Sequence, residues 1–231
     1  MDNRCVAFCD SGVGGLELLK RVASAFPDEN FVYLADSDNL PYGNKSEDEM
    51  RIIADSVINK LLSFAPKLIV TACNTLSVTL NDEKRDRGVK IIGVLPRGGV
   101  GRGYVFCTPR TATCKYVRTL TATGAYVAGI DGLAGEIEYD VLNHKIVDVK
   151  HYFDGYDTAV DYVSLGCTHY GLVRSEIHKI FPDSAIIDGI DETEKQIVSF
   201  LRDHPCERDK GEVCFLGKKR RKIQDYYLNF L

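Results

Sequence analysis

Short apolar runs alternate with segments of helical periodicity along most of the chain. Val6–Cys9 and Phe31–Ala35 are predicted to be buried strands. Between them, apolar residues recur every three or four positions from Leu16 to Phe26, which predicts an amphipathic helix that ends before Pro27. A repeated strand–helix order of this kind predicts α/β architecture, with a parallel sheet covered by helices on both faces.

The same rhythm continues to the end of the chain. Ser46 and Glu49 have the spacing of a capping box, which predicts a helix that begins there and stops before Pro66. A threonine-rich turn is predicted at Thr108–Thr113, followed by a helical stretch. The other predicted strands are Lys67–Ala72, Val89–Leu95, Tyr104–Cys107, Tyr162–Leu165, Ala185–Asp188 and Glu212–Leu216.

Two pairs of segments resemble each other within the chain. Val6–Ser11 is similar to Tyr104–Pro109, and Val70–Thr75 is similar to Ser164–His169. The pairs occur in the same order and at nearly the same offset. They indicate either two duplicated α/β halves or buried strands that look alike by chance. On composition, Gly98–Gly103 is the best candidate for a linker between the halves.

Composition and charge narrow the class of protein. The 231 residues carry a formal net charge of −4, with 45% hydrophobic and 27% charged residues, as is ordinary for a soluble globular protein. The mild acidity argues against a general nucleic-acid binder, and we interpret the basic run at 218–222 as a solvated helix face. No apolar run is long enough to cross a membrane, and the first residues lack a signal-peptide pattern. We therefore expect a cytoplasmic protein with reduced cysteines and no zinc motif.

Two cysteines stand where an open α/β sheet binds its ligands. Cys73 and Cys167 each follow a predicted strand and precede small polar residues that could begin a helix. A helix N-terminus at this position is expected to lower the pKa of the thiol and to offer backbone N–H groups to a carboxylate. The alternative is that both cysteines are small apolar residues at strand ends.

Two further side chains are candidates for proton transfer. His169 lies two residues beyond Cys167, and Asp10 ends the first predicted strand, so either could act as an acid or base or polarise a thiol. A hydrogen-bonded structural histidine and a turn-forming aspartate are the alternatives. The Asp10–Gly15 loop is rich in glycine, but Glu17 stands at the third glycine position of the dinucleotide fingerprint. We therefore expect this loop to approach a small ligand.

Taken together, these motifs resemble those of the cofactor-independent glutamate racemases of the aspartate/glutamate racemase superfamily. The matching segments, in the family's order, are Asp10–Gly15, Pro41–Ser46, Ala72–Thr75 and Gly166–Tyr170. The resemblance is weakest over Arg97–Asp161. It implies two similar parallel-sheet α/β domains that face each other across a cleft, with the C-terminal strand and helix returning to the first domain. The expected limits are 1–96 with 206–231 for the first domain and 97–205 for the second.

By this resemblance, Cys73 and Cys167 are the two acid/base catalysts, one on each face of the substrate Cα, and Asp10 and His169 assist them. The residues matched to substrate-binding positions are Asp10, Ser11, Pro41, Tyr42, Gly43, Cys73, Asn74, Thr75, Thr111, Cys167, Thr168 and His169. Asp131 is the candidate for the acidic residue that orients the histidine in this family. Gly171 stands where the family commonly has proline.

The implied activity is the interconversion of L- and D-glutamate, which supplies D-glutamate for peptidoglycan. The resemblance also implies a homodimer that binds a small-molecule substrate, glutamate. We expect no cofactor, no bound metal, and no binding to nucleic acid or to a membrane. Two alternatives stay open at this point. One is a racemase for aspartate or another amino acid, and the other is a non-catalytic amino-acid-binding protein on the same scaffold.

Overall fold

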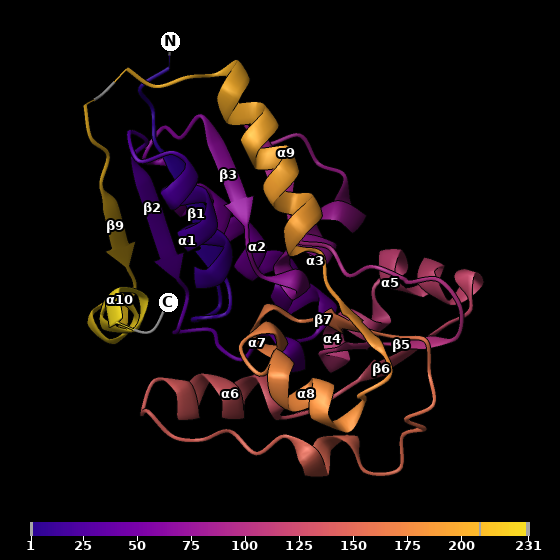
Figure 1. The fold of residues 1–231 in the computed structure, drawn as a ribbon. Helices are drawn as coiled ribbons and strands as arrows, with labels where there is room; N and C mark the ends of the chain where they lie inside the picture. The colour runs from indigo at the N-terminus through magenta and orange to yellow at the C-terminus, as the bar shows by residue number, and fades with distance from the viewer. Residues whose placement is uncertain (1, 208, 230–231) are drawn as a thin grey trace.

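A computed structural model describes residues 2–207 and 209–229, and Figure 1 shows their arrangement around two parallel sheets. The first sheet has the strand order β4 (Lys90–Gly93), β3 (Leu68–Thr71), β1 (Val6–Asp10), β2 (Phe31–Ala35) and β9 (Val213–Leu216). The second has the order β6 (Ala125–Gly129), β5 (Gly103–Cys107), β7 (Tyr162–Gly166) and β8 (Ala185–Ile187). Because β9 pairs with β2, the C-terminal strand returns to the first sheet, as predicted.

Helices cover both faces of the first sheet, since its strands are buried on both sides. The apolar sides of α1 (Leu16–Ala25) and α9 (Ile190–Asp203) pack with Val6 and Phe8 of β1. On the other face, α2 (Glu47–Leu62) and α3 (Asn74–Glu83) pack with Ala7 and Cys9. The alternation of side chains along β1 therefore builds two separate cores. The last helix, α10 (Arg220–Asn229), follows β9 and contributes Ile223 to the core beneath α1.

The second sheet is built in the same way but with shorter helices. Both α6 (Leu133–Val141) and α8 (Arg174–Ile180) pack on one face, around Phe106 and Leu165. The other face packs against Val117 of α5 (Lys115–Thr119) and Val78 of α3. The remaining short elements are η1 (Tyr42–Asn44), α4 (Pro109–Thr113), η2 (Leu120–Thr123), η3 (Lys150–Phe153) and α7 (Thr168–Gly171).

Two sequence-based expectations were wrong in this second half. Thr108–Thr113 is not a turn, because the Thr108 hydroxyl accepts from the N–H of Thr111 and Pro109 occupies the first helical position, which together begin α4. The strand β6 was not predicted at all. It is an edge strand without charged side chains, but three of its five residues are alanine or glycine, which have low β propensity, so its strand signal is weak.

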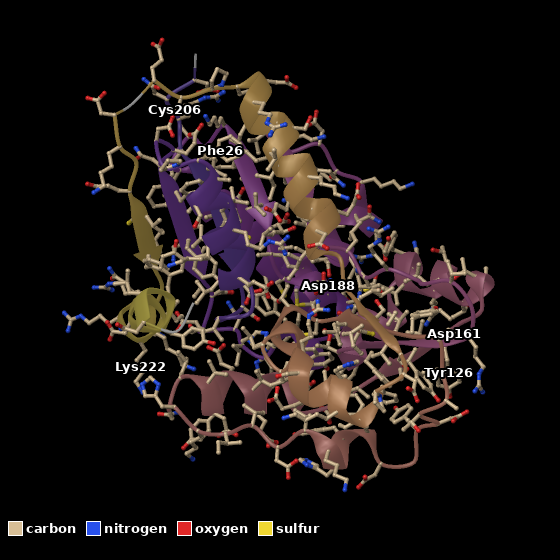
Figure 2. The ribbon with its side chains drawn as sticks, viewed as in Figure 1. Phe26, Tyr126, Asp161, Asp188, Cys206 and Lys222 are labelled. Atoms are coloured by element: carbon tan, nitrogen blue, oxygen red, sulfur yellow. The ribbon has the colours of Figure 1, made fainter. Side chains whose placement is uncertain are left out.

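The chain passes between the two sheets twice, and the two passages lie side by side. A Cβ added to Gly189 would lie 2.2 Å from the carbonyl oxygen of Leu95, so this close approach requires glycine. Asp188, at the same junction, is labelled in Figure 2. After Gly189 the chain enters α9, which packs in the first core although it falls within the stretch 97–205. The expected domain limits stay a proposal, and this packing favours a boundary near residue 189.

The capping box predicted from the sequence is present at the start of α2 and gives a test of local stability. The Ser46 hydroxyl accepts from the N–H of Glu49, and the Glu49 side chain accepts from the N–H of Ser46. We expect Ser46→Ala to lower the free energy of unfolding by about 1 kcal/mol, measured by urea denaturation. Ser63→Ala, at the other end of the same helix, is the matched control. An equal loss in both variants would contradict a specific contribution from the cap.

Candidate active site

The carboxyl ends of the central strands of both sheets meet at one place. Asp10 ends β1, and Cys73 follows β3 after one residue. Thr108 and Cys167 directly follow β5 and β7 of the second sheet. All four side chains are buried. The structure therefore brings both candidate cysteines, one from each sheet, to a common interior.

Cys73 occupies the N-cap position of α3, as the sequence indicated, but its pKa is shifted in the opposite direction to the one expected. Burial raises the pKa of the Cys73 thiol, and the charge of nearby Asp10 adds to this effect. The backbone N–H groups of Leu76 and Thr75 act in the expected, lowering direction but are outweighed. Cys167 is also among the groups whose charge raises the pKa of Cys73, so the two thiols are close enough to interact electrostatically.

Asp10 connects the two halves of the site. One of its carboxylate oxygens accepts a hydrogen bond of 2.8 Å from the N–H of Gly12, and the other accepts one of 3.1 Å from the hydroxyl of Thr168. Burial raises the pKa of Asp10, although the positive charge of His169 and the two hydrogen bonds act against this rise. A carboxyl group with a raised pKa, held near Cys73, is suited to exchange protons with that thiol.

His169 is oriented by Glu138 and not by Asp131. The Nε2 atom of His169 lies 3.0 Å from Oε2 of Glu138, and both side chains are almost fully buried. Asp131, the candidate drawn from the family resemblance, is exposed in the bend before α6, so that candidate was wrong. The sequence did contain a signal for Glu138. It lies between Ile137 and Val141 on the side of α6 that is otherwise apolar, where an isolated carboxylate needs a partner.

The charges of this pair support each other. Burial alone lowers the pKa of His169, but its hydrogen bonds with the side chains of Cys167 and Glu138 outweigh burial and raise it well above the usual value. Burial alone would raise the pKa of Glu138, but the hydrogen bond and charge of His169 and the N–H of Val13 lower it. We infer that a protonated His169 and an ionised Glu138 stand next to Cys167.

Three threonine hydroxyl groups join the two sheets on the other side of the site. The Oγ1 atom of Thr75 in α3 lies 3.0 Å from that of Thr108 and 2.9 Å from that of Thr111. Thr75 and Thr111 were predicted from the sequence, but Thr108 was missed. Its signal was present, because a threonine before proline at the end of a strand is a common helix N-cap.

The other predicted binding residues differ in whether their side chains are buried at the site. Ser11 and Asn74 are buried at the site, and the Asn74 side-chain oxygen has no hydrogen-bond partner among the described residues. Gly43 is packed against Thr108, where an added Cβ would lie 2.7 Å from the threonine Cβ. Tyr42 is buried but donates its hydroxyl proton to Asp36 at 2.7 Å, whereas Pro41 is exposed.

Close contact between the glycine loop and α6 gives a second test. An added Cβ at Gly12 would lie 2.2 Å from Oε2 of Glu138. We expect Gly12→Ala to lower the free energy of unfolding by about 1–3 kcal/mol, because the loop and α6 must move apart to fit the added methyl group. The same movement should displace Glu138 and reduce turnover at least about tenfold. Gly135→Ala in α6 is the control, because nothing lies within 4 Å of its added Cβ. Full turnover in Gly12→Ala would show that this close approach is dispensable.

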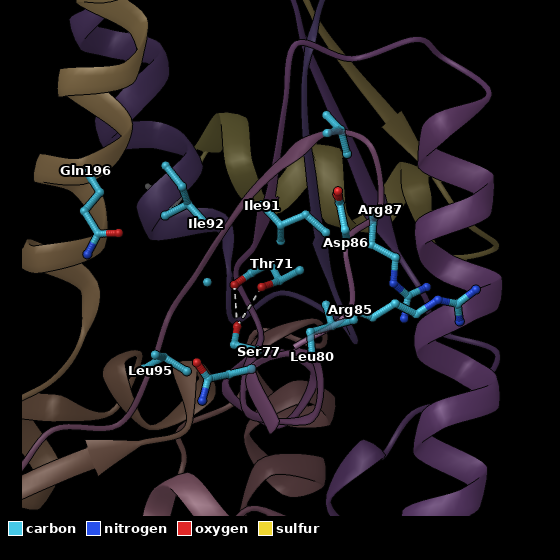
Figure 3. Close-up of a pocket in the computed structure, with 13 residues that line it drawn as sticks. Thr71, Ser77, Leu80, Arg85, Asp86, Arg87, Ile91, Ile92, Leu95 and Gln196 are labelled. Atoms are coloured by element: carbon cyan, nitrogen blue, oxygen red, sulfur yellow. Dashed lines mark hydrogen bonds between the residues drawn. The ribbon is translucent and has the colours of Figure 1, made fainter. Parts of the chain in front are cut away.

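Two cavities differ in their relation to the site. One small space is lined by Asn74, Cys167 and Thr168, but neither Cys73 nor Asp10 lines it. A separate cavity of about 350 Å³ lies between α3, β4 and α9 (Figure 3). Its floor is formed by the hydrogen-bonded hydroxyls of Thr71 and Ser77, and neither cysteine of the site lines it.

Comparison with known proteins places the chain in a family. No family model matches it. A glutamate racemase of Clostridium acetobutylicum is 33% identical to it, over 96% of this chain and 91% of the relative. A glutamate racemase of Clostridium botulinum strain Kyoto is 30% identical, over 92% of this chain and 90% of the relative. The chain belongs to the glutamate racemase family.

Solved structures agree with this assignment. The glutamate racemase of Francisella tularensis in complex with D-glutamate is 25% identical, with a TM-score of 0.81 over 99% of this chain and 94% of that one. The fold also matches the Thermus thermophilus glutamate racemase, with a TM-score of 0.84 at 24% identity and the same coverage of both chains. As a glutamate racemase the chain is an amino-acid racemase, an isomerase. Within residues 2–207 and 209–229, no helix is long and apolar enough to span a membrane.

Proposed function

We propose that the chain interconverts L- and D-glutamate by proton transfer at Cα between Cys73 and Cys167. The observation that carries this proposal is the meeting of two buried thiols from two different sheets. Each thiol has its own proton-exchanging neighbours, Asp10 beside Cys73 and the His169–Glu138 pair beside Cys167. Racemisation removes a proton from one face of Cα and returns one to the other face, which two such groups accomplish.

The proton balance of the reaction requires one thiolate and one thiol. The thiolate takes the α-proton, the electron pair stays on Cα and its carboxylate, and the opposite thiol gives its proton to the other face. The two cysteines exchange protonation states, and no electron is transferred. Because burial raises the pKa of Cys73, the positive α-ammonium group of the substrate is needed to stabilise a thiolate there.

Donors near the thiols are suited to the negative charge of the substrate. We propose that the first backbone N–H groups of α3, with the hydroxyls of Thr75, Thr111 and Thr168, hold the substrate carboxylates. The partnerless Asn74 oxygen is an acceptor for the α-ammonium group. Donors directed at the developing carbanion in a dry site lower the barrier more than they would in water.

The proposed activity is tested by circular dichroism of L- and D-glutamate in ²H₂O, followed by mass spectrometry of Cα. We expect loss of the optical signal from both enantiomers, with one deuterium incorporated in each product molecule. Racemisation of aspartate but not of glutamate would show that aspartate is the substrate. Tight glutamate binding by calorimetry with no exchange at Cα would contradict catalysis and favour a binding protein.

We also propose a biological setting for this activity. The product D-glutamate would supply peptidoglycan synthesis, in the cytoplasm, with the enzyme acting as a homodimer. Growth of a D-glutamate auxotroph that expresses the chain, without added D-glutamate, would support the role in peptidoglycan synthesis. Sedimentation equilibrium gives the oligomeric state, and a monomer with full activity would contradict the dimer.

A further inference from the structure

One peptide group in the glycine loop is held at both of its ends. The carbonyl oxygen of Gly12 accepts a hydrogen bond of 2.8 Å from the hydroxyl of Tyr33. The N–H of Val13, which belongs to the same peptide group, donates at 2.8 Å to Oε2 of Glu138. That carboxylate oxygen is also the one that lies 3.0 Å from Nε2 of His169. A continuous series of hydrogen bonds therefore runs from the first sheet to the histidine beside Cys167.

Tyr33 is fixed firmly enough to hold this peptide group. It lies in the middle of β2, paired with Phe8 of β1 on one side and Phe215 of β9 on the other. Its side chain is fully buried, and its ring lies 5.9 Å from that of Phe215, measured between centroids. The position of its hydroxyl is therefore set by the sheet and not by the loop.

Hydrogen bonds fix the loop on either side of this peptide group, because the N–H of Gly12 donates to Asp10 at 2.8 Å and the carbonyl oxygen of Val13 accepts from the N–H of Leu16 at 3.1 Å. The Gly12–Val13 peptide group itself bonds to Tyr33 and Glu138. Glycine is required at position 12 by the contact with Glu138, and Gly14 and Gly15 follow closely. Glycine adopts more backbone conformations than other residues, so a peptide group beside it rotates at low cost. Rotation of the Gly12–Val13 peptide group would turn the N–H away from Glu138. A hydrogen bond at the carbonyl oxygen opposes this rotation and also strengthens the N–H as a donor.

We propose that Tyr33 is a positioning residue for the Cys167 side of the reaction, acting through the Gly12–Val13 peptide group on Glu138 and thereby on His169. The inference rests on the proposed function. Among the described residues, the hydroxyl of Tyr33 bonds to the carbonyl oxygen of Gly12 and to neither thiol. Its role is to keep a donor aimed at Glu138, so that the carboxylate stays ionised and holds the imidazole in place.

The first test removes only the hydroxyl group. We expect Tyr33→Phe to lower kcat for both enantiomers of glutamate about tenfold, with KM changed by less than about twofold, because one hydrogen bond in the series is lost. Tyr162→Phe is the matched control, because the Tyr162 hydroxyl is also buried but has no hydrogen-bond partner among the described residues. We expect it to leave kcat unchanged. Equal kcat in Tyr33→Phe and the parent protein would overturn the proposal.

A double-mutant cycle separates action through Glu138 from a general structural role. If Tyr33 acts through that carboxylate, Tyr33→Phe should cost nothing further in a Glu138→Gln background. A further tenfold fall in kcat in that background would contradict the proposed route. Unfolding midpoints of all variants establish that each is folded under the assay conditions.

The third measurement does not depend on turnover. In protein with ¹⁵N-labelled histidine, the His169 signal is assigned from its absence in His169→Gln, and its pKa is followed by NMR. We expect Tyr33→Phe to shift this titration, with no shift in Tyr162→Phe. If the parent protein does not racemise glutamate, the titration still tests whether Tyr33 acts on His169 through the Gly12–Val13 peptide group and Glu138. A lower unfolding midpoint with unchanged titration and kcat would make Tyr33 merely structural.

Discussion

Replacing either Cys73 or Cys167 by serine should lower glutamate racemisation at least about 10³-fold in both directions. Serine keeps nearly the size of cysteine, but its hydroxyl is a far weaker acid than a thiol. Each direction uses both groups, one to remove the α-proton and the other to return a proton. Neither direction should therefore survive the loss of one thiol.

The measurement combines circular dichroism with hydrogen exchange at Cα in ²H₂O. A single variant should retain exchange with one enantiomer at most, because only one face of Cα keeps a base. Cys9→Ala is the matched control, since Cys9 is a buried thiol on the strand next to Cys73 and is assigned no role. It should racemise glutamate within about twofold of the parent rate. Racemisation at the parent rate in Cys73→Ser or Cys167→Ser would remove the basis of the two-thiol mechanism.

The second large effect is expected from Glu138→Gln, which should lower kcat about 100-fold. Glutamine keeps the shape of the side chain but removes the charge that supports protonated His169. The pKa of His169 should therefore fall, and His169 should lose its proton at a lower pH. The change in kcat that follows this proton loss should shift to lower pH by the same amount. The measurement is kcat against pH, from about pH 5 to pH 9.

Asp131→Asn is the matched control for Glu138→Gln. Both substitutions convert an acid of the α6 region to its amide, but Asp131 is exposed and Glu138 is buried against His169. Asp131→Asn should leave kcat and its pH dependence unchanged. A large effect of Asp131→Asn with none of Glu138→Gln would reverse the assignment made from the structure.

Local sequence patterns were enough to predict the central strands and the positions of both thiols. Buried parallel strands are short continuous apolar runs, and Cys73 and Cys167 stand just after two of them. The capping box at Ser46 was predictable for the same reason, since both hydrogen bonds join residues three apart. By contrast, β6 escaped prediction because alanine and glycine make up three of its five residues and have low β propensity.

The sequence by itself therefore determined the α/β class and the family to which the chain belongs, and the family resemblance implied the return of the C-terminal strand. Only the tertiary structure decided that Glu138 holds His169, because that contact joins residues 31 positions apart. Only the tertiary structure decided the direction of the Cys73 pKa shift, because burial depends on every element packed around the thiol. The same holds for the series from Tyr33 to His169, which crosses between two sheets through a single peptide group. Periodicity and spacing report the local backbone, whereas burial and long-range contacts arise only when the whole chain is folded.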